Sequence, residues 1–213
     1  QTVNWGVLQA IGLAGLVTLL FIRANSYVRL VVGLVLLAAY QILLDHFWLE
    51  EVLAAPHGGV LGAFSWSAML ILATVLADIF HRTKRGNWNL LFASFVFVTI
   101  ALALTHWFPI SKNRVSAPYV ILSLGLSGLL FTASHLLVEK LKMKLTLFAI
   151  WGRNPLVMYV LHMLLLGIVY LPELPILYSQ APIWLVSLES ILLLGLLTWA
   201  TWKLNKNKRY ITL

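Results

Sequence analysis

Seven long apolar segments, separated by short polar connections, make up most of this sequence. Within a few residues they cover 5–22, 28–44, 59–80, 88–108, 118–138, 145–171 and 183–202. A helix needs roughly 20 mostly apolar residues to cross about 30 Å of hydrocarbon, where its backbone must satisfy its own hydrogen bonds. Only 10% of the residues are charged and 61% are hydrophobic. The sequence therefore predicts an all-α fold, a polytopic bundle of about seven transmembrane spans, forming a single transmembrane domain over residues 1–213.

The basic residues predict how this bundle is oriented, because short cytoplasmic loops retain Lys and Arg. Of the 15 Lys and Arg, twelve lie in the first, third and fifth connections and the C-terminal tail, two (Lys112 and Arg114) lie in the other connections, and Arg153 lies inside a segment. This bias places the C-terminus in the cytoplasm. Membrane topology thus explains the net charge of +8, and we expect no nucleic-acid partner.

The beginning of the chain leads to a further expectation. Seven spans with a cytoplasmic C-terminus put residue 1 outside, yet the chain starts with Gln1 and shows no signal-peptide pattern before Trp5. We therefore expect helices upstream, and expect this chain to be the C-terminal part of a longer fold. Without cysteine, disulfides and a cysteine nucleophile are excluded. No zinc-ligand pair, P-loop or nucleophile elbow is present, so no metal is expected.

The sixth apolar segment contains a cation and a helix breaker at membrane depth. Its residues 151–155 read Trp-Gly-Arg-Asn-Pro. Pro155 has no N–H and disfavours helix at Asn154, so the span is predicted to break there. The free N–H groups of the second half, together with Arg153, would suit a phosphate or carboxylate. The alternative is a simple kink, with Arg153 snorkelling to the cytoplasmic surface.

Two ionisable residues lie at similar predicted depths in the last two segments. His162 lies close to the helical face of Pro155, and Glu189 lies about six residues inside the seventh segment. Paired in a low dielectric, they would form a proton-transfer unit, because the carboxylate fixes the tautomer of the imidazole. The alternative is a structural hydrogen bond between packed helices.

Two external connections carry the other candidate residues. The connection 45–58 is expected to be a loop at the membrane interface, and it ends in Pro56-His-Gly-Gly59, where the glycines allow a ligand to approach His57 closely. The connection 110–114 combines Lys112 and Asn113 beside the membrane and would suit an anionic or sugar ligand. Alternatively, the first simply ends a loop and the second caps two helices.

Four stretches, in order, resemble one protein family. Residues 5–12 (WGVLQAIG) resemble a "GVLQRI" helix start, 57–62 (HGGVLG) a "DPEGLLG" loop, 110–120 (ISKNRVSAPYV) an "INKNLWTPSYVL" loop and helix, and 152–159 (GRNPLVMY) a "G-x-N-x-L-x-x-Y" helix. Together they are similar to the bacterial relatives of heparan-alpha-glucosaminide N-acetyltransferase, which are integral-membrane acyltransferases. The sequence departs from this pattern at Ala10, where the family usually carries Arg, and at His57, where an acidic residue is expected.

The resemblance implies a multi-pass protein of the bacterial inner membrane. It implies transfer of an acetyl group from acetyl-CoA, as co-substrate, to an amino sugar across the membrane. Lys112, Asn113, Asn154 and the loop at His57 would then line the reaction cavity or its mouth. The family's catalytic His lies on N-terminal helices that this chain does not contain.

Two functions from different classes follow. In an acyltransferase acting on a sugar or glycan, His162 with Glu189, or else His57, would supply the base, Asn113 or Asn154 would stabilise the oxyanion, and Arg153 would hold the CoA phosphates. In a non-catalytic subunit, the helices would instead scaffold a larger complex. Its partners would be membrane lipids, other membrane subunits or a second copy of the chain. A small transporter built on the broken sixth span is a third reading.

Overall fold

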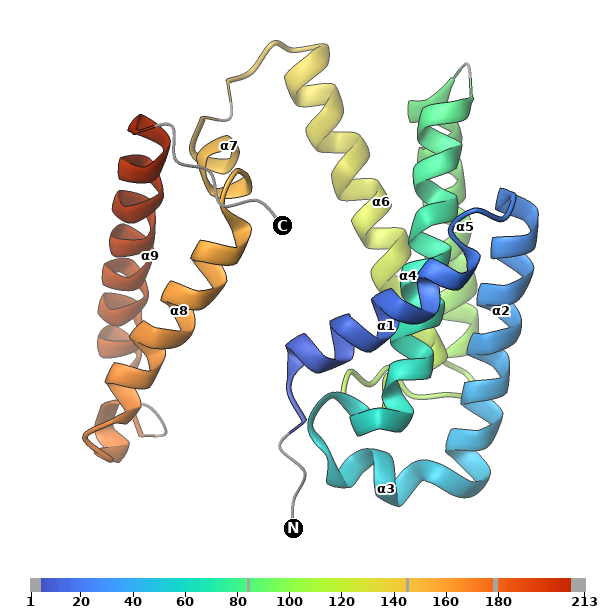
Figure 1. The fold of residues 1–213 in the computed structure, drawn as a ribbon, viewed down its shortest axis with the longest axis horizontal. Coiled ribbons are helices and arrows are strands. Elements are labelled where there is room, and N and C mark those ends of the chain that lie inside the picture. The colour runs from blue at the N-terminus through green and yellow to red at the C-terminus, as the bar shows by residue number, and fades with distance from the viewer. Residues whose placement is uncertain (1–4, 84, 145, 178–179, 208–213) are drawn as a thin grey trace. The chain divides into compact units, whose positions relative to one another are not determined.

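The computed structural model describes residues 5–83, 85–144, 146–177 and 180–207 (Figure 1). All regular secondary structure in these ranges is helical, which confirms the predicted all-α class. The chain forms two compact units, Gln1–Lys140 and Leu141–Leu213. The single domain expected over 1–213 stays a prediction.

All seven apolar segments contain helices in the described residues. Five helical stretches are long and apolar enough to cross a membrane: Ser26–Ala54, Pro56–Arg82, Gly86–Leu104 (α5), Ala117–Glu139 (α6) and Ile183–Lys206 (α9). The bent pair α7 (Thr146–Gly152) and α8 (Pro155–Tyr170) would add a sixth, and α1 (Val7–Phe21) is shorter, with 15 residues. These helices fit an integral multi-pass membrane protein. The count of seven spans and the side of the C-terminus stay predictions.

The predicted break in the sixth segment is confirmed. α7 ends at Gly152, α8 begins at Pro155, and the two helices are bent by 86°. A proline is well placed as the first residue of a helix, where its missing N–H leaves no hydrogen bond unmade. The local chemistry of Pro155 therefore sets where the first helix stops and the second begins.

The interfacial loop expected over 45–58 is wrong for most of its length. α2 (Ser26–Leu43) continues through a π-helical turn, η1 (Leu44–Trp48), into α3 (Leu49–Ala54), and Figure 1 shows α3 lying across the end of α2. Leu44, Trp48 and Val52 recur every four residues, and they pack with Tyr40 in a small core. The proline and apolar residues of this connection favoured an interfacial loop, but the four-residue spacing of these packed side chains is that of a helix.

The core of the first unit lies where α4 (Gly59–Arg82) and α6 pack with α2 and α5. Glycines bring α5 and α6 into close contact. A Cβ at Gly128 would lie 2.1 Å from Ser94 Oγ, and one at Gly125 would lie 2.7 Å from Val98 Cγ2. Small residues at helix interfaces allow such approach inside a membrane. The unit is thus tightly packed around α4, which also carries one wall of the candidate site.

A buried ion pair ties the start of α2 to the end of α4. Arg29 is 3% exposed and donates to the carboxylate of Asp78, which also accepts a 2.5 Å hydrogen bond from Ser26 Oγ. Arg82, one helical turn after Asp78, lies 3.1 Å from the same carboxylate. Arg29 and Ser26 are far from Asp78 in sequence, so this cluster couples two helices rather than capping one.

Candidate functional site

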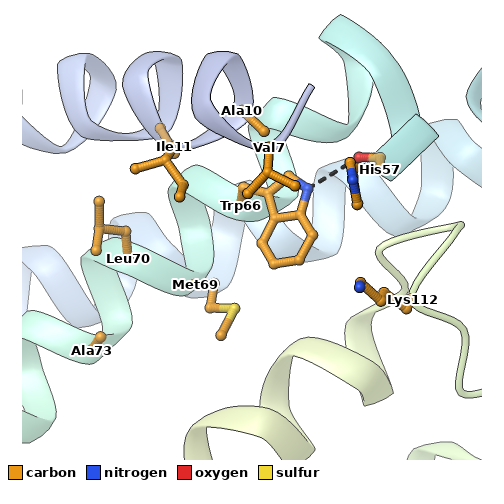
Figure 2. A pocket seen from close by; sticks show the side chains of 10 residues that line it. Val7, Ala10, Ile11, His57, Trp66, Met69, Leu70, Ala73 and Lys112 are labelled. Carbon is orange, nitrogen blue, oxygen red and sulfur yellow. Dashed lines mark hydrogen bonds between the residues drawn. The ribbon is translucent and has the colours of Figure 1, made fainter. Parts of the chain in front are cut away.

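A pocket of about 300 Å³ in the first unit is the candidate site (Figure 2). Two helices and two connections form its walls. α1 and α4 contribute apolar side chains, and the connections contribute the basic residues His57 and Lys112. The lining residues are Val7, Ala10, Ile11, Ala14, His57, Trp66, Met69, Leu70, Ala73 and Lys112.

The helical part of the pocket has a regular basis in sequence. On α1 the lining residues are positions 7, 10, 11 and 14, and on α4 they are positions 66, 69, 70 and 73. Both sets follow the i, i+3, i+4, i+7 spacing of a single helix face. The pocket is therefore a groove between two facing helical stripes, and the small side chains Ala10 and Ala14 lie buried on its α1 side.

The backbone at His57 is held in an uncommon conformation. Residues 56–58 form a 3-10 turn (η2), and φ is 57° at His57, 81° at Gly58 and 61° at Gly59. A positive φ is uncommon for a residue with a side chain, and it persists when surrounding contacts hold it. Trp66 Nε1 donates a 3.0 Å hydrogen bond to the His57 carbonyl. This bond fixes the turn to α4 and keeps the imidazole at the pocket.

Hydrogen bonds from buried side chains hold the connection that carries Lys112 in place. Tyr40 Oη donates a 2.7 Å hydrogen bond to the Arg114 carbonyl, and Ser65 Oγ donates one of 2.7 Å to the Val115 carbonyl. The Val115 side chain is fully buried, and a Cβ on Gly58 would lie 3.0 Å from it. The two connections that supply His57 and Lys112 thus pack on each other.

Gln41, on α2, links that helix to the first turn of α6. Its Oε1 accepts a 2.7 Å hydrogen bond from the Ala117 N–H, in the first turn of α6, and its Nε2 donates a 2.9 Å bond to Asp45. Ser116, the residue that precedes α6, provides no side-chain cap for that helix. Gln41, which is 4% exposed, therefore satisfies a helix N–H that would otherwise be buried without an acceptor.

We expect Gln41→Leu to destabilise the protein by about 2 kcal/mol, because the buried Ala117 N–H loses its acceptor. Denaturation of the purified protein in detergent measures the change. Thr99→Val is the control, since Thr99 is exposed and its hydroxyl donates to Phe95 O, one turn earlier in the same helix. Equal stabilities of the two variants would contradict this role for Gln41.

The structure brings two of the predicted site residues together. His57 and Lys112 line the same pocket. Asn113 is exposed next to Lys112 and is not among the lining residues, so its place at the mouth of the cavity stays a prediction. Trp66 was not predicted as a site residue. Its spacing from Leu70 and Ala73, which places the three on one helix face, could have indicated it.

His162 and Glu189 line a cavity of about 610 Å³ in the second unit, between α8 and α9. Their similar depths thus correspond to a shared cavity. In the described part of the chain, however, neither a hydrogen bond nor an ion pair joins the two side chains. Their pairing as a proton-transfer unit stays a prediction.

Arg153 and Asn154 lie at the break between α7 and α8. The exposed guanidinium of Arg153 donates a 2.6 Å hydrogen bond to Asn205 Oδ1, near the end of α9. Asn154 is completely buried. Trp151 Nε1 donates a 3.2 Å bond to Thr198, also on α9. Two hydrogen bonds from the end of α7 and the residue that follows it thus hold the break against α9. The binding of an anion by Arg153 stays a prediction.

Comparison with protein-family models, curated proteins and solved structures finds no match to this chain.

Proposed function

We propose that this protein is an integral-membrane acyltransferase and that the pocket between α1 and α4 binds the acceptor. One observation carries the proposal. Three of the four stretches that resemble the acetyltransferase family contribute to this single pocket: 5–12 through Val7, Ala10 and Ile11, 57–62 through His57, and 110–120 through Lys112. These stretches are far apart in sequence, so their convergence needs the tertiary fold. Their meeting in one pocket supports the proposal that the three stretches bind one ligand together.

The chemistry suits the two basic side chains. His57 takes the proton from the amine or hydroxyl of the acceptor, whose nitrogen or oxygen then attacks the acyl carbon of acetyl-CoA. Lys112 stabilises the negative charge that develops on the acyl oxygen. The new bond to the acceptor forms as the carbon–sulfur bond breaks, and coenzyme A leaves with the sulfur electrons. The CoA thiolate takes up the proton from His57, so the products are the acetylated acceptor and coenzyme A, and His57 is regenerated.

The distribution of Lys and Arg supports a location for this reaction. With the C-terminus in the cytoplasm, His57 and Lys112 lie at the external face of a bacterial inner membrane. Binding of CoA phosphates by Arg153 is a separate proposal for the second unit, and it rests on the guanidinium group alone. The protein partners that we propose are further membrane subunits or a second copy of the chain.

Acetyl transfer by the full-length protein in membrane vesicles tests the proposal, with labelled acetyl-CoA and glucosamine as substrates. We expect His57→Ala to lower the rate roughly a hundredfold, through loss of the proton acceptor. His106→Ala is the matched control, because His106 is an exposed histidine after the end of α5 and does not line the pocket. Its rate should equal that of the wild type.

Two outcomes would overturn the proposal. One is a wild-type rate in His57→Ala. The other is no transfer by folded wild-type protein, with any amino sugar offered, which would favour a non-catalytic membrane subunit.

A further inference from the structure

The candidate pocket is basic at one end and apolar at the other. Figure 2 shows His57 and Lys112 on one side of the Trp66 ring, with Leu70 and Ala73 on the other. Trp66 and Ala73 are seven residues apart on α4, which corresponds to about 10 Å along the helix. A small hydrophilic acceptor would leave this apolar length unused.

The basic end favours an anion. Lys112 supplies an ammonium group with three hydrogen-bond donors, and the imidazole of His57 offers a ring N–H beside it. Among the ten described residues that line the pocket, none is a carboxylate that would neutralise the ammonium of Lys112. Lys112 is exposed at the pocket, so its ammonium can follow a ligand headgroup. A phosphate, with oxygens that accept charge-assisted hydrogen bonds, fits this end.

The apolar end of the pocket lies beside a helix, α1, whose outer side chains suit contact with lipid chains. The other faces of α1 present large apolar side chains outward, with Leu8, Leu16 and Leu20 57%, 64% and 78% exposed. Side chains of this kind need hydrocarbon around them. The groove between α1 and α4 is lined by apolar side chains from the same stretch of α1. Its small residues Ala10, Ala14 and Ala73 leave space for part of a lipid chain.

We infer that the pocket binds a phosphate-bearing lipid, with the phosphate at Lys112 and His57 and the first part of its chain in the groove between α1 and α4. As the assignment of an acceptor class, a lipid-linked phosphate carrying the group to be acylated, this inference rests on the proposed function. As an assignment of binding, it rests on the pocket alone. A free phosphate would not need the groove, and a neutral lipid would not need Lys112.

Fluorescence quenching tests the binding directly. The full-length protein in detergent is titrated with dodecyl phosphate brominated on its chain, which quenches a tryptophan that it contacts. We expect saturable quenching that Trp66→Phe largely removes. Lys112→Ala should weaken binding roughly tenfold, through loss of a charge-assisted contact. Lys206→Ala is the control, since Lys206 lies on α9 in the second unit, against Trp202.

A second pair of variants tests the groove independently of the charge. Ala73→Leu fills its apolar end and should weaken binding of the dodecyl probe more than that of a brominated hexyl phosphate. Ala103→Leu, an exposed site on α5, should change neither. Both substitutions add the same side chain, so a general effect of leucine on folding would appear in both.

Several results would overturn the inference. These are quenching that survives Trp66→Phe unchanged, equal affinity for brominated dodecanol, full displacement by inorganic phosphate at similar concentration, and no saturable binding. The acetyl-transfer assay is separate. Transfer to glucosamine without lipid binding would leave the proposed function standing and refute the lipid, whereas lipid binding without transfer to any acceptor would do the reverse.

Discussion

Replacing Asp78 with Ala is expected to lower the free energy of unfolding by about 3 kcal/mol, because it leaves a buried guanidinium without its counter-ion. Arg29 is 3% exposed, and Asp78 is the one carboxylate that contacts it in the described part of the chain. Ser26 would also lose the acceptor of its 2.5 Å hydrogen bond. The loss separates the start of α2 from the end of α4.

Denaturation in detergent measures this change, and Arg82→Ala is the matched control. The Arg82 side chain is 70% exposed and contacts the same carboxylate at 3.1 Å. Exposed ion pairs contribute about 0–1 kcal/mol, so Arg82→Ala should be nearly silent. A double variant that replaces both Arg29 and Asp78 with leucine should recover most of the loss, because no charge is then buried alone. If Asp78→Ala costs no more than Arg82→Ala, the pair does not couple the two helices.

Gly62→Val is expected to destabilise the protein by about 3 kcal/mol and to disturb the candidate site. Gly62 lies in the first turns of α4, under the His57 turn, and is buried. A Cβ there would lie 2.7 Å from the His57 carbonyl oxygen and 3.3 Å from Val115 Cγ2. The nearer atom is backbone, which cannot rotate away, so the turn itself must move. Both connections of the pocket would shift with it.

Gly12→Val on α1 is the control for Gly62→Val. A Cβ at Gly12 would meet nothing within 4 Å, so the same side chain should be tolerated. We expect Gly62→Val alone to lose binding of the phosphate lipid as well as stability. Retention of wild-type stability and binding by Gly62→Val would show that the turn at His57 is not held as the structure indicates.

The elements of the fold could largely be predicted from sequence, because a membrane span is a local property. Composition over about 20 residues decides whether a helix can lie in hydrocarbon. The break at 153–154 was equally readable, since Pro155 restricts itself and the residue before it. The helix at 44–54 was not predicted, because the proline and apolar residues of this connection were interpreted as an interfacial loop, and the spacing of Leu44, Trp48 and Val52 was not considered.

The candidate site could be predicted only in part. His57 and Lys112 were each singled out from their own connections, yet nothing local says that the two connections pack together. Their proximity depends on Tyr40 and Ser65, which reach the second connection from α2 and α4. Trp66 was missed because a tryptophan in an apolar segment is expected at an interface or in a core.

The sequence by itself determined that the long segments are apolar enough to lie in a membrane. It also determined that the secondary structure is helical and where one helix breaks. These depend on hydropathy and on backbone chemistry within a few residues. Only the tertiary structure decided which residues share a pocket, which carboxylate neutralises Arg29, and which glycine lies under the His57 turn. The physical reason is that helices in lipid associate by close packing and by scattered hydrogen bonds, and these depend on the shapes of two surfaces at once.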